Sequence, residues 1–200
     1  MDINVKHSWK AIVGLSSRGY TCGYCNRPLA SEKGWHSNNS GFIYVCHHCT
    51  RPTFFDFHGE QIPGVMHGNP VGDITDKSVS ALYDEARSTT QANAYTATVL
   101  CCRKLLMHVA VSKGAKLGES FAFYVTYLAE KNFVPPDAMG WIDHIRKKGN
   151  EANHEITIMK KDDAEELLSF TEMLLRIIYE FPAMVAKKYQ QGQQGKGKTT

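Results

Sequence analysis

Hydrophobic residues from about Asp76 onward recur every three or four positions, which is the spacing of the buried face of an α-helix. In the last such stretch, a wide apolar stripe runs from Leu167 to Phe181. Five helices joined by short loops indicate a compact bundle. The spacing predicts these five helices at about Lys77–Thr90, Ala92–Lys113 and Glu119–Glu130, between Asp137 and Gly149, and at Asp162–Lys188.

Sequence signals also predict where the last helix begins and ends. Asp162 followed by Glu165 resembles a capping box, with Asp in place of the usual Ser or Thr. Pro182 has no backbone N–H and its ring clashes with the preceding turn, so we expect it to kink the helix or to end its main part. Residues 190–200 contain Gln, Gly, Lys and Thr with almost nothing to bury, and we expect this tail to be disordered.

The first 58 residues have a different pattern, in which hydrophobic and polar positions alternate over short segments. Phe42–Val45 and Thr53–Phe57 are predicted strands, and the turn residues 38–41 precede the first of them. We find no internal repeat. The pattern predicts an α+β protein with a small β module at 1–58, a Gly- and Pro-rich linker at 59–75, a mainly helical bundle at 76–189 and the tail at 190–200.

Four of the six cysteines form two close pairs in the β module, Cys22-Gly-Tyr-Cys25 and Cys46-His-His-Cys49, separated by twenty residues. Two residues between cysteines let one tight turn aim both thiolates at the same ion, and two such turns complete a tetrahedron. A module this small gains from a metal because burial alone gives it little stability. The sequence therefore predicts a zinc ribbon with one structural zinc ion held by Cys22, Cys25, Cys46 and Cys49, which leaves no open position for catalysis.

Other interpretations of this region stay open at this stage. The cysteines could form disulfides or remain free thiols. His47 and His48 lie between the ligands and could compete for the ion, although we expect them to face solvent or to cap the site. Tyr24, Trp35 and Phe54 are expected to form the small core around the metal, and stacking on nucleic-acid bases is the alternative role.

Composition and charge narrow the class of protein. The hydrophobic fraction of 42% and the charged fraction of 22% are ordinary for a globular protein. Four lysines after Pro182 account for the net charge of +3, and residues 73–182 hold 13 basic against 16 acidic groups. This balance weighs against tight, sequence-independent nucleic-acid binding by the helical part, since such binding depends on clustered positive charge.

The sequence contains no segment of the kind that enters a membrane. The longest nearly unbroken apolar run, Phe121–Ala129, is far short of the roughly 20 residues that a membrane span needs. The stretch Met1–Lys10 has no apolar core of the signal-peptide type. Closely paired cysteines are typical of metal binding in a reducing compartment. We therefore expect a cytoplasmic protein with no membrane partner.

The segment Trp141–His154 reads Trp-Ile-Asp-His-Ile-Arg-Lys-Lys-Gly-Asn-Glu-Ala-Asn-His. Together with Leu82–Ala86, Cys102–Leu106 and Tyr179–Pro182, it resembles the prokaryotic domain of unknown function family four-one-four-five, over about residues 75–186. An N-terminal zinc ribbon is a familiar companion in that family. Its members resemble the HEPN superfamily of helical bundles and occur in restriction and other defence-associated proteins. The resemblance implies a HEPN-like bundle, a defence-associated setting and, by analogy, a homodimer.

Some HEPN proteins are metal-independent ribonucleases, whose signature is an Arg, usually a polar residue such as Asn, and a His four to six residues beyond the Arg. Asn150 and His154 match its later part, but Gly149 stands at the Arg position and Arg146 lies three residues earlier. In a catalytic reading, the resemblance implies that His154 is the general acid/base and that Arg146 or Lys148 stabilises charge at phosphorus. In a structural reading, Gly149 ends the helix, Asn150 caps the next turn and His154 is buried and hydrogen-bonded. A ligand-binding role is the third reading.

These observations favour a non-catalytic, zinc-containing interaction protein that binds a protein or nucleic-acid partner, in a defence or mobile-element setting. The predicted metal site is saturated, the ribonuclease signature is incomplete, and the sequence offers no other catalytic constellation. The alternative hypothesis is a metal-independent endoribonuclease of the HEPN type that uses Arg146 and His154.

Overall fold

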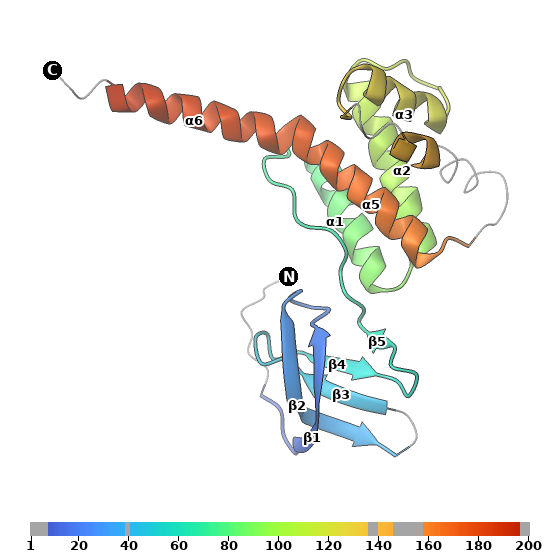
Figure 1. Cartoon of the computed structure of the whole chain (residues 1–200), viewed down its shortest axis with the longest axis vertical. Helices are drawn as coiled ribbons and strands as arrows, with labels where there is room; N and C mark the ends of the chain where they lie inside the picture. Colours follow the sequence, from blue (N-terminus) through green and yellow to red (C-terminus); the bar gives the residue numbers. More distant parts are fainter. Residues whose placement is uncertain (1–7, 39–40, 136–139, 146–157, 197–200) are drawn as a thin grey trace. The chain divides into compact units, whose positions relative to one another are not determined.

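The computed structural model describes residues 8–38, 41–135, 140–145 and 158–196, with side chains described up to residue 190. The chain divides into two compact units, residues 1–67 with 88–94, and residues 68–87 with 95–200. The first contains an antiparallel sheet of five strands and the second contains the packed helices (Figure 1). The predicted α+β class is thus confirmed.

The sheet is a meander in which every strand pairs with its neighbours in sequence. Two of the strands, Gly41–Val45 and Pro52–Phe55, confirm those that the sequence predicted at 42–45 and 53–57, whereas the other three were not foreseen. The last strand, Gln61–Ile62, lies within the segment expected to be a linker. The strands are β1 (Val13–Thr21), β2 (Pro28–Ser37), β3 (Gly41–Val45), β4 (Pro52–Phe55) and β5 (Gln61–Ile62).

Aromatic rings pack on one face of this sheet. Tyr44 and Phe55 are each only 3% exposed, and their ring centroids lie 5.8 Å apart. Tyr20 packs edge-on against Phe55, at 5.2 Å between centroids. Of the aromatic residues expected in this core, Trp35 is half-buried and Tyr24 is exposed. The alternation of side chains along β3 and β4 places Tyr44 and Phe55 inward, so these two form the core instead.

The helices confirm the predicted pattern, and each end of the first three lies within three residues of its predicted position. The fourth predicted helix falls partly outside the described residues, and its described part is helical over residues 140–145. Within the part of the chain that the structure describes, no helix combines the length and apolar character needed to cross a membrane. The helices are α1 (Lys77–Gln91), α2 (Tyr95–Ser112), α3 (Phe121–Glu130), α5 (Lys161–Leu175), the π-helical turn η2 (Arg176–Glu180) and α6 (Phe181–Lys196).

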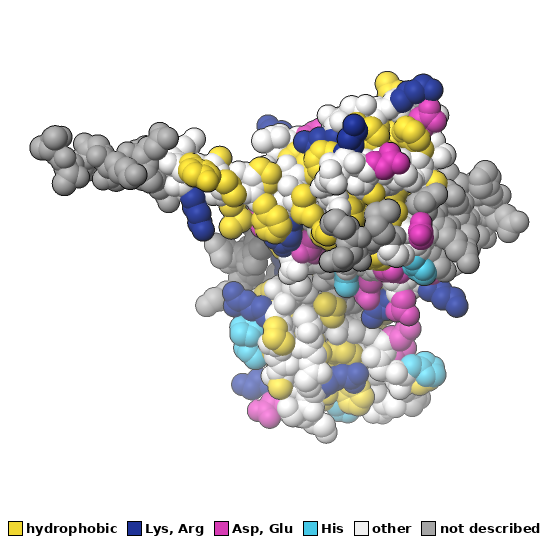
Figure 2. Space-filling view, turned by 45° about the horizontal axis from the view of Figure 1, so that its top comes forward, with side chains coloured by type: hydrophobic (Ala, Val, Ile, Leu, Met, Phe, Trp, Pro, Cys, Tyr) yellow, Lys and Arg dark blue, Asp and Glu magenta, His cyan; other side chains and the backbone are white. Residues whose placement is uncertain are grey.

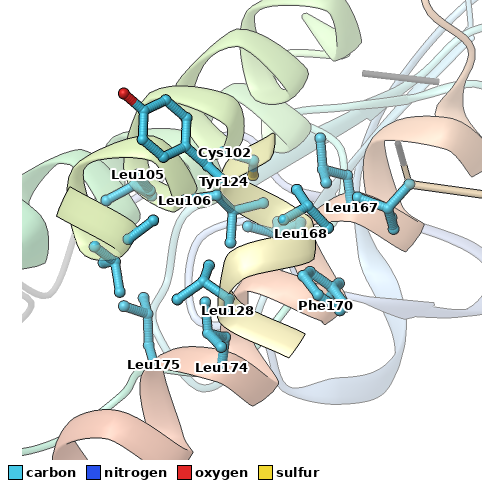
Figure 3. Packing of buried hydrophobic residues seen from close by; sticks show 14 of the residues in the cluster. Cys102, Leu105, Leu106, Tyr124, Leu128, Leu167, Leu168, Phe170, Leu174 and Leu175 are labelled. Carbon is cyan, nitrogen blue, oxygen red and sulfur yellow. The ribbon is translucent and has the colours of Figure 1, made fainter. Parts of the chain in front are cut away.

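The core of the helical unit lies where α2, α3 and α5 meet (Figure 3). Leu106 of α2, Leu128 of α3 and Leu168 of α5 are each at most 1% exposed. Cys102 is fully buried in the same cluster, as expected of a core thiol. Phe170 packs edge-on against Trp141, with 5.1 Å between the ring centroids. These contacts bury the apolar stripe that the spacing of the sequence predicted.

One continuous helix runs from α5 through η2 into α6. Pro182 does not end it, because the turn before the proline widens. The N–H of Phe181 donates to the carbonyl of Arg176, five residues back, instead of to the residue four back. This π turn directly precedes the proline, whose ring would clash with the regular α-helical turn before it. The helix continues to Lys196, into the stretch expected to be disordered.

The predicted capping box at the start of this helix is wrong. Lys160 occupies the N-cap position and makes no side-chain capping hydrogen bond. Asp162 and Asp163 lie inside the first turn, where their negative charge interacts favourably with the positive end of the helix dipole. The acidic start of the helix therefore stabilises it electrostatically rather than through a cap.

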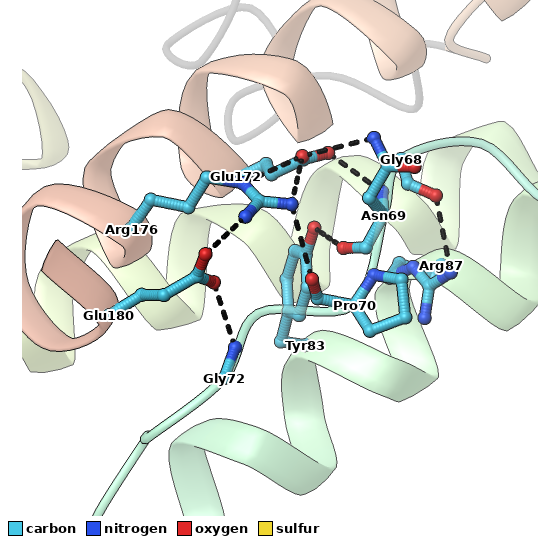
Figure 4. Close-up of polar contacts among 9 residues, drawn as sticks. All are labelled: Gly68, Asn69, Pro70, Gly72, Tyr83, Arg87, Glu172, Arg176 and Glu180. Carbon is cyan, nitrogen blue, oxygen red and sulfur yellow. Dashed lines mark hydrogen bonds and ion pairs between the residues drawn. The ribbon is translucent and has the colours of Figure 1, made fainter. Parts of the chain in front are cut away.

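A polar clamp, formed by Tyr83, Arg87, Glu172, Arg176 and Glu180, holds the segment 68–72 against the helices (Figure 4). Four of its contacts go to the backbone of residues 69–72. The N–H of Asn69 donates to Glu172 at 2.8 Å, the hydroxyl of Tyr83 donates to Asn69 O at 2.8 Å, Arg176 donates to Pro70 O at 3.2 Å, and the N–H of Gly72 donates to Glu180 at 2.9 Å.

We expect this clamp to loosen at acid pH. Burial disfavours the charged form of Glu172, but the N–H of Asn69, the amide of its side chain and the guanidinium of Arg176 outweigh it and lower the pKa of this carboxyl. A lowered folded-state pKa means that the stabilisation is present above the unfolded pKa of about 4.3 and is lost as pH falls through the folded value. Amide hydrogen exchange at Asn69, corrected for the intrinsic rate, should therefore accelerate below about pH 4. Glu172→Gln should show this faster exchange already at pH 7, whereas the exposed Glu130→Gln should not.

Candidate metal centre

Two turns of the first unit bring the paired cysteines together. The first turn, Cys22–Arg27, joins β1 to β2, and the second, Cys46–Arg51, joins β3 to β4. Each turn therefore lies at the tip of an antiparallel hairpin. Because β1 to β4 are consecutive antiparallel strands of one sheet, both hairpin tips lie at the same end of the sheet. The strands thus place four cysteines side by side.

The two turns have the same backbone hydrogen bonds. In the first, the N–H of Cys22 donates to Arg27 O at 2.9 Å and the N–H of Asn26 donates to Cys22 O at 2.8 Å. In the second, the corresponding distances from Cys46 to Arg51 and from Thr50 to Cys46 are 3.0 and 2.8 Å. The residue after the second cysteine is left-handed in both turns, with φ of 55° and 57°. This bend turns both sulfur atoms of a pair to the same side.

The four sulfur atoms lie within 4.8 Å of one another. Cys22 Sγ is 3.6 Å from Cys49 Sγ, and Cys25 Sγ is 3.8 Å from Cys46 Sγ. Sulfurs 2.3 Å from a tetrahedral zinc ion would be about 3.8 Å apart, which these distances match. A disulfide needs about 2.05 Å, and all four cysteines are free thiols, so the disulfide interpretation is wrong. The four cysteines form a candidate metal site.

Backbone amides at this site oppose the effect of burial on the thiol pKa values. Burial raises the pKa of the Cys22 thiol, against the opposing effect of the Cys25 and Tyr24 N–H groups. At Cys46 burial acts in the same direction, but the N–H groups of Cys49 and His48 contribute to a net lowering of its pKa. A thiolate is the form that binds a metal, and a cation would compensate the buried negative charge. Burial also raises the pKa of the Cys49 thiol. A bound cation would therefore offset the cost that burial imposes on the thiolates of this site.

The first turn is supported by residues from the segment predicted as a linker and from the region predicted as a helical bundle. Gln61 donates from its amide to Thr21 O at 2.8 Å, and the amide of Gln91 donates to Gly23 O. The carbonyls of Pro63 and Gly64 approach Gly23 so closely that a β-carbon there would overlap them. A glycine is therefore required at the second position of the first turn, where the second turn has a histidine.

The exposed side of the two turns carries aromatic and basic side chains. His47 and His48 are exposed, with ring centroids 4.2 Å apart, and neither belongs to the cysteine cluster. Tyr24 is 39% exposed, and the guanidinium of Arg51 lies 5.1 Å from the centre of its ring. Arg27 is exposed at the equivalent position of the first turn. This set, called here the turn surface, therefore has no part in holding the metal.

The structure also reveals a repeat that we did not recognise in the sequence. Cys22–Pro28 reads Cys-Gly-Tyr-Cys-Asn-Arg-Pro and Cys46–Pro52 reads Cys-His-His-Cys-Thr-Arg-Pro. The shared order of Cys, Cys, Arg and Pro within seven residues was available as a signal in the sequence. The segment is too short to be recognised as a repeat without its backbone geometry. The repeated Pro begins β2 and β4, at the first position of a strand where proline is tolerated.

The predicted catalytic residues Arg146, Asn150 and His154 lie outside the described residues, as do Lys148 and Gly149. Their role therefore stays a prediction. In the neighbouring described part, His144 Nε2 lies 2.9 Å from a carboxylate oxygen of Glu166.

Comparison with protein families matches residues 84–192 to Domain of unknown function (DUF4145). Comparisons with curated proteins and with solved structures found no match. The matched region contains α2, α3, α5 and η2 and does not include the cysteine cluster. The further likeness to HEPN bundles stays a prediction. Because the match covers more than half of the 200 residues, the chain belongs to the family of unknown function DUF4145.

Proposed function

We propose that this chain is a non-catalytic binding protein whose first unit is stabilised by one structural zinc ion and uses the turn surface to bind a single-stranded nucleic acid. A protein partner is the competing possibility. The observation that supports the proposal is the gathering at the two turns of the exposed side chains of Tyr24, Arg27, His47 and His48 with the half-buried Arg51.

Zinc is the ion that best suits four thiolates in a closed tetrahedron. Iron accepts the same donor set, so metal analysis must distinguish the two ions. With all four positions filled by sulfur, the ion has no place for water or substrate, and its role is structural. This supports a binding function over a metal-dependent reaction.

The charge of the turn surface favours nucleic acid over most protein partners. Neither residues 13–31 nor residues 41–55 contain an acidic residue. Arginine side chains neutralise phosphates and stack on bases, and an exposed tyrosine offers a platform for a further base. The exposed ring of Tyr24 can stack on an unpaired base, whereas the bases of a duplex are already stacked, which favours a single strand over a duplex.

Removing both arginines of the turn surface should weaken nucleic-acid binding by about tenfold and lower the slope of log affinity against log salt by about 1 to 2. The reason is that Arg27→Ala with Arg51→Ala deletes two phosphate contacts and leaves the cysteines in place. The measurement is fluorescence anisotropy of a labelled single-stranded RNA and of the DNA of the same sequence, at several salt concentrations. Bound metal should be quantified for each variant.

The matched control is Lys10→Ala with Lys33→Ala. It removes the same charge from the same unit but from exposed positions outside the turn surface, and it should leave the affinity within about twofold. If both double variants lose affinity equally, binding reflects overall charge and not the turn surface. If the wild type binds neither RNA nor DNA, the nucleic-acid assignment fails, and a protein partner should then be sought.

The same preparation tests the non-catalytic part of the proposal. Incubation of RNA with the protein in excess chelator should leave the RNA intact. Cleavage that disappears in His154→Ala would instead establish the metal-independent endoribonuclease expected from Arg146, Asn150 and His154. A prokaryotic, defence-associated setting and a cytoplasmic location remain predictions from the resemblance and the composition.

A further inference from the structure

The second unit carries an uncovered apolar stripe on its C-terminal helix. Phe181, Met184, Val185 and Tyr189 are 49%, 47%, 52% and 72% exposed. Figure 2 shows hydrophobic side chains gathered along this helix. Residues 184–190 are exposed on every side of α6, so the described chain buries none of them. A helix without packing is marginally stable in water, and α6 contains a proline and two glycines.

The stripe continues onto the preceding part of the same helix. Met173 and Ile177 are half-buried and share a shallow groove with Phe181, Ser169, Glu172 and Arg176. Helical spacing extends this line to Glu166, seven residues before Met173. Beyond Phe181 the line passes Val185 and reaches Lys188. The line from Glu166 to Lys188 is about 33 Å long, because each residue adds about 1.5 Å.

The two halves of this helix carry opposite charges. The α5 half, Lys161–Leu175, contains five acidic residues and one basic residue, whereas the α6 half contains three lysines and no acidic residue. Lys187 is already paired with Asp73, at 2.6 Å. Lys188 lies at the basic end of the stripe and is exposed. Glu166 lies at the acidic end, where one of its carboxylate oxygens is also 2.9 Å from His144 Nε2. Ile177 is about midway between them.

We propose that the stripe from Glu166 to Lys188 is the interface of a symmetric homodimer in which the α5–η2–α6 helices of two copies pair antiparallel. Ile177 lies near the twofold axis, so Phe181 of one copy meets Met173 of the other and Val185 meets Ser169. Lys188 of each copy then faces Glu166 of its partner. A twofold interface uses the same patch on both copies, so the patch must be complementary to itself. This stripe meets that condition, because its two ends carry opposite charges.

The charges decide the direction of pairing. A parallel pair would place Lys188 beside the same lysine of the second copy, and Glu166 beside Glu166, so like charges would meet at both ends of the stripe. The antiparallel pair places opposite charges at both ends and buries the apolar centre. Like charges at such positions are unfavourable, and opposite charges add modestly to the apolar contact.

Light scattering coupled to size-exclusion chromatography tests the dimer at micromolar concentration. The full-length chain should have twice the mass of one 22.4 kDa chain. Val185→Glu should yield the monomer with unchanged helical circular dichroism, because Val185 is 52% exposed in one copy and contributes little to the fold. The matched control Leu100→Glu replaces a residue on α2 that is 48% exposed, and it should remain dimeric. A monomeric wild type, or a dimer that survives Val185→Glu, overturns the proposal.

A charge exchange tests the antiparallel direction. Lys188→Glu alone and Glu166→Lys alone should each raise the dimer dissociation constant by about tenfold, since each change acts at both ends of the interface. The double variant should return to within about threefold of the wild type, because the two charges are exchanged across the interface. Lys104→Glu, at an exposed position of α2, is the control and should have no effect. A double variant as weak as the single variants excludes antiparallel pairing.

Discussion

Cys46→Ser is expected to abolish tight metal binding and to unfold the β-sheet unit while the helical unit keeps its structure. The reason is that the sheet is small and its strands β1 to β4 converge on the four cysteines. The free energy of binding a structural zinc ion is folding free energy, on the order of 10 kcal/mol for small zinc domains at neutral pH. Cys46 is fully buried and its sulfur lies 3.8 Å from that of Cys25, so a hydroxyl there leaves an incomplete site.

Mass-spectrometric metal analysis and hydrogen exchange together check this expectation. The wild type should hold one zinc ion per chain, and exchange should be fast across β1 to β4 in Cys46→Ser but not across α2 and α5. Cys101→Ser is the matched control, because Cys101 lies on α2 outside the cysteine cluster. A wild type that contains iron would correct the identity of the ion. A wild type that contains no metal and keeps a protected sheet would refute the metal centre itself.

Leu168→Ala is expected to destabilise the helical unit by about 3 kcal/mol. Leu168 is fully buried where α5 packs on α2 and α3, so removing three carbon atoms leaves a cavity that rigid neighbouring helices cannot fill. Urea unfolding followed by the helical circular dichroism signal gives the free energy directly. A loss of this size is a large share of the 5–15 kcal/mol that typically separates a folded domain from its unfolded state.

The matched control for this substitution is Leu117→Ala. Leu117 is 75% exposed, so the same three carbon atoms are removed from the solvent-exposed surface and not from the core. Its effect should stay within about 0.5 kcal/mol. Equal effects at the two positions would contradict the packing described for α2, α3 and α5.

The two substitutions Cys46→Ser and Leu168→Ala also distinguish the two proposals, nucleic-acid binding by the turn surface and dimerisation. If the turn surface binds nucleic acid, Cys46→Ser should abolish that binding, whereas Leu168→Ala should affect it little at temperatures where the sheet unit remains folded. If dimerisation uses the α5–η2–α6 stripe, Leu168→Ala should weaken it, because α5 holds one half of the stripe. The two proposals rest on different units of the chain and can fail independently.

The sequence by itself determined the α+β class, the helices of the second unit and the four cysteines that form the candidate metal site. Each of these depends on local signals. The periodicity of Leu167, Leu168, Leu174 and Leu175 reports a buried helix face, and the spacing of two cysteines within a turn fixes which sulfurs can meet. Strands β3 and β4 were predicted for the same reason, since their hydrophobic residues form short runs beside turn residues.

Only the tertiary structure decided the rest. β1 and β2 are rich in Gly, Ser and charged residues, so their pairing is recognised from the ladder and not from their own pattern. Gln61, Gly64 and Gln91 support the first cysteine turn from regions predicted as linker and helical bundle. The sequence did not show this, because such contacts join residues distant in sequence. Pro182 remains inside a helix because a π turn precedes it, and α6 leaves its apolar side uncovered. A periodic pattern predicts that a face is apolar, but only the packed neighbours show whether the chain itself buries that face.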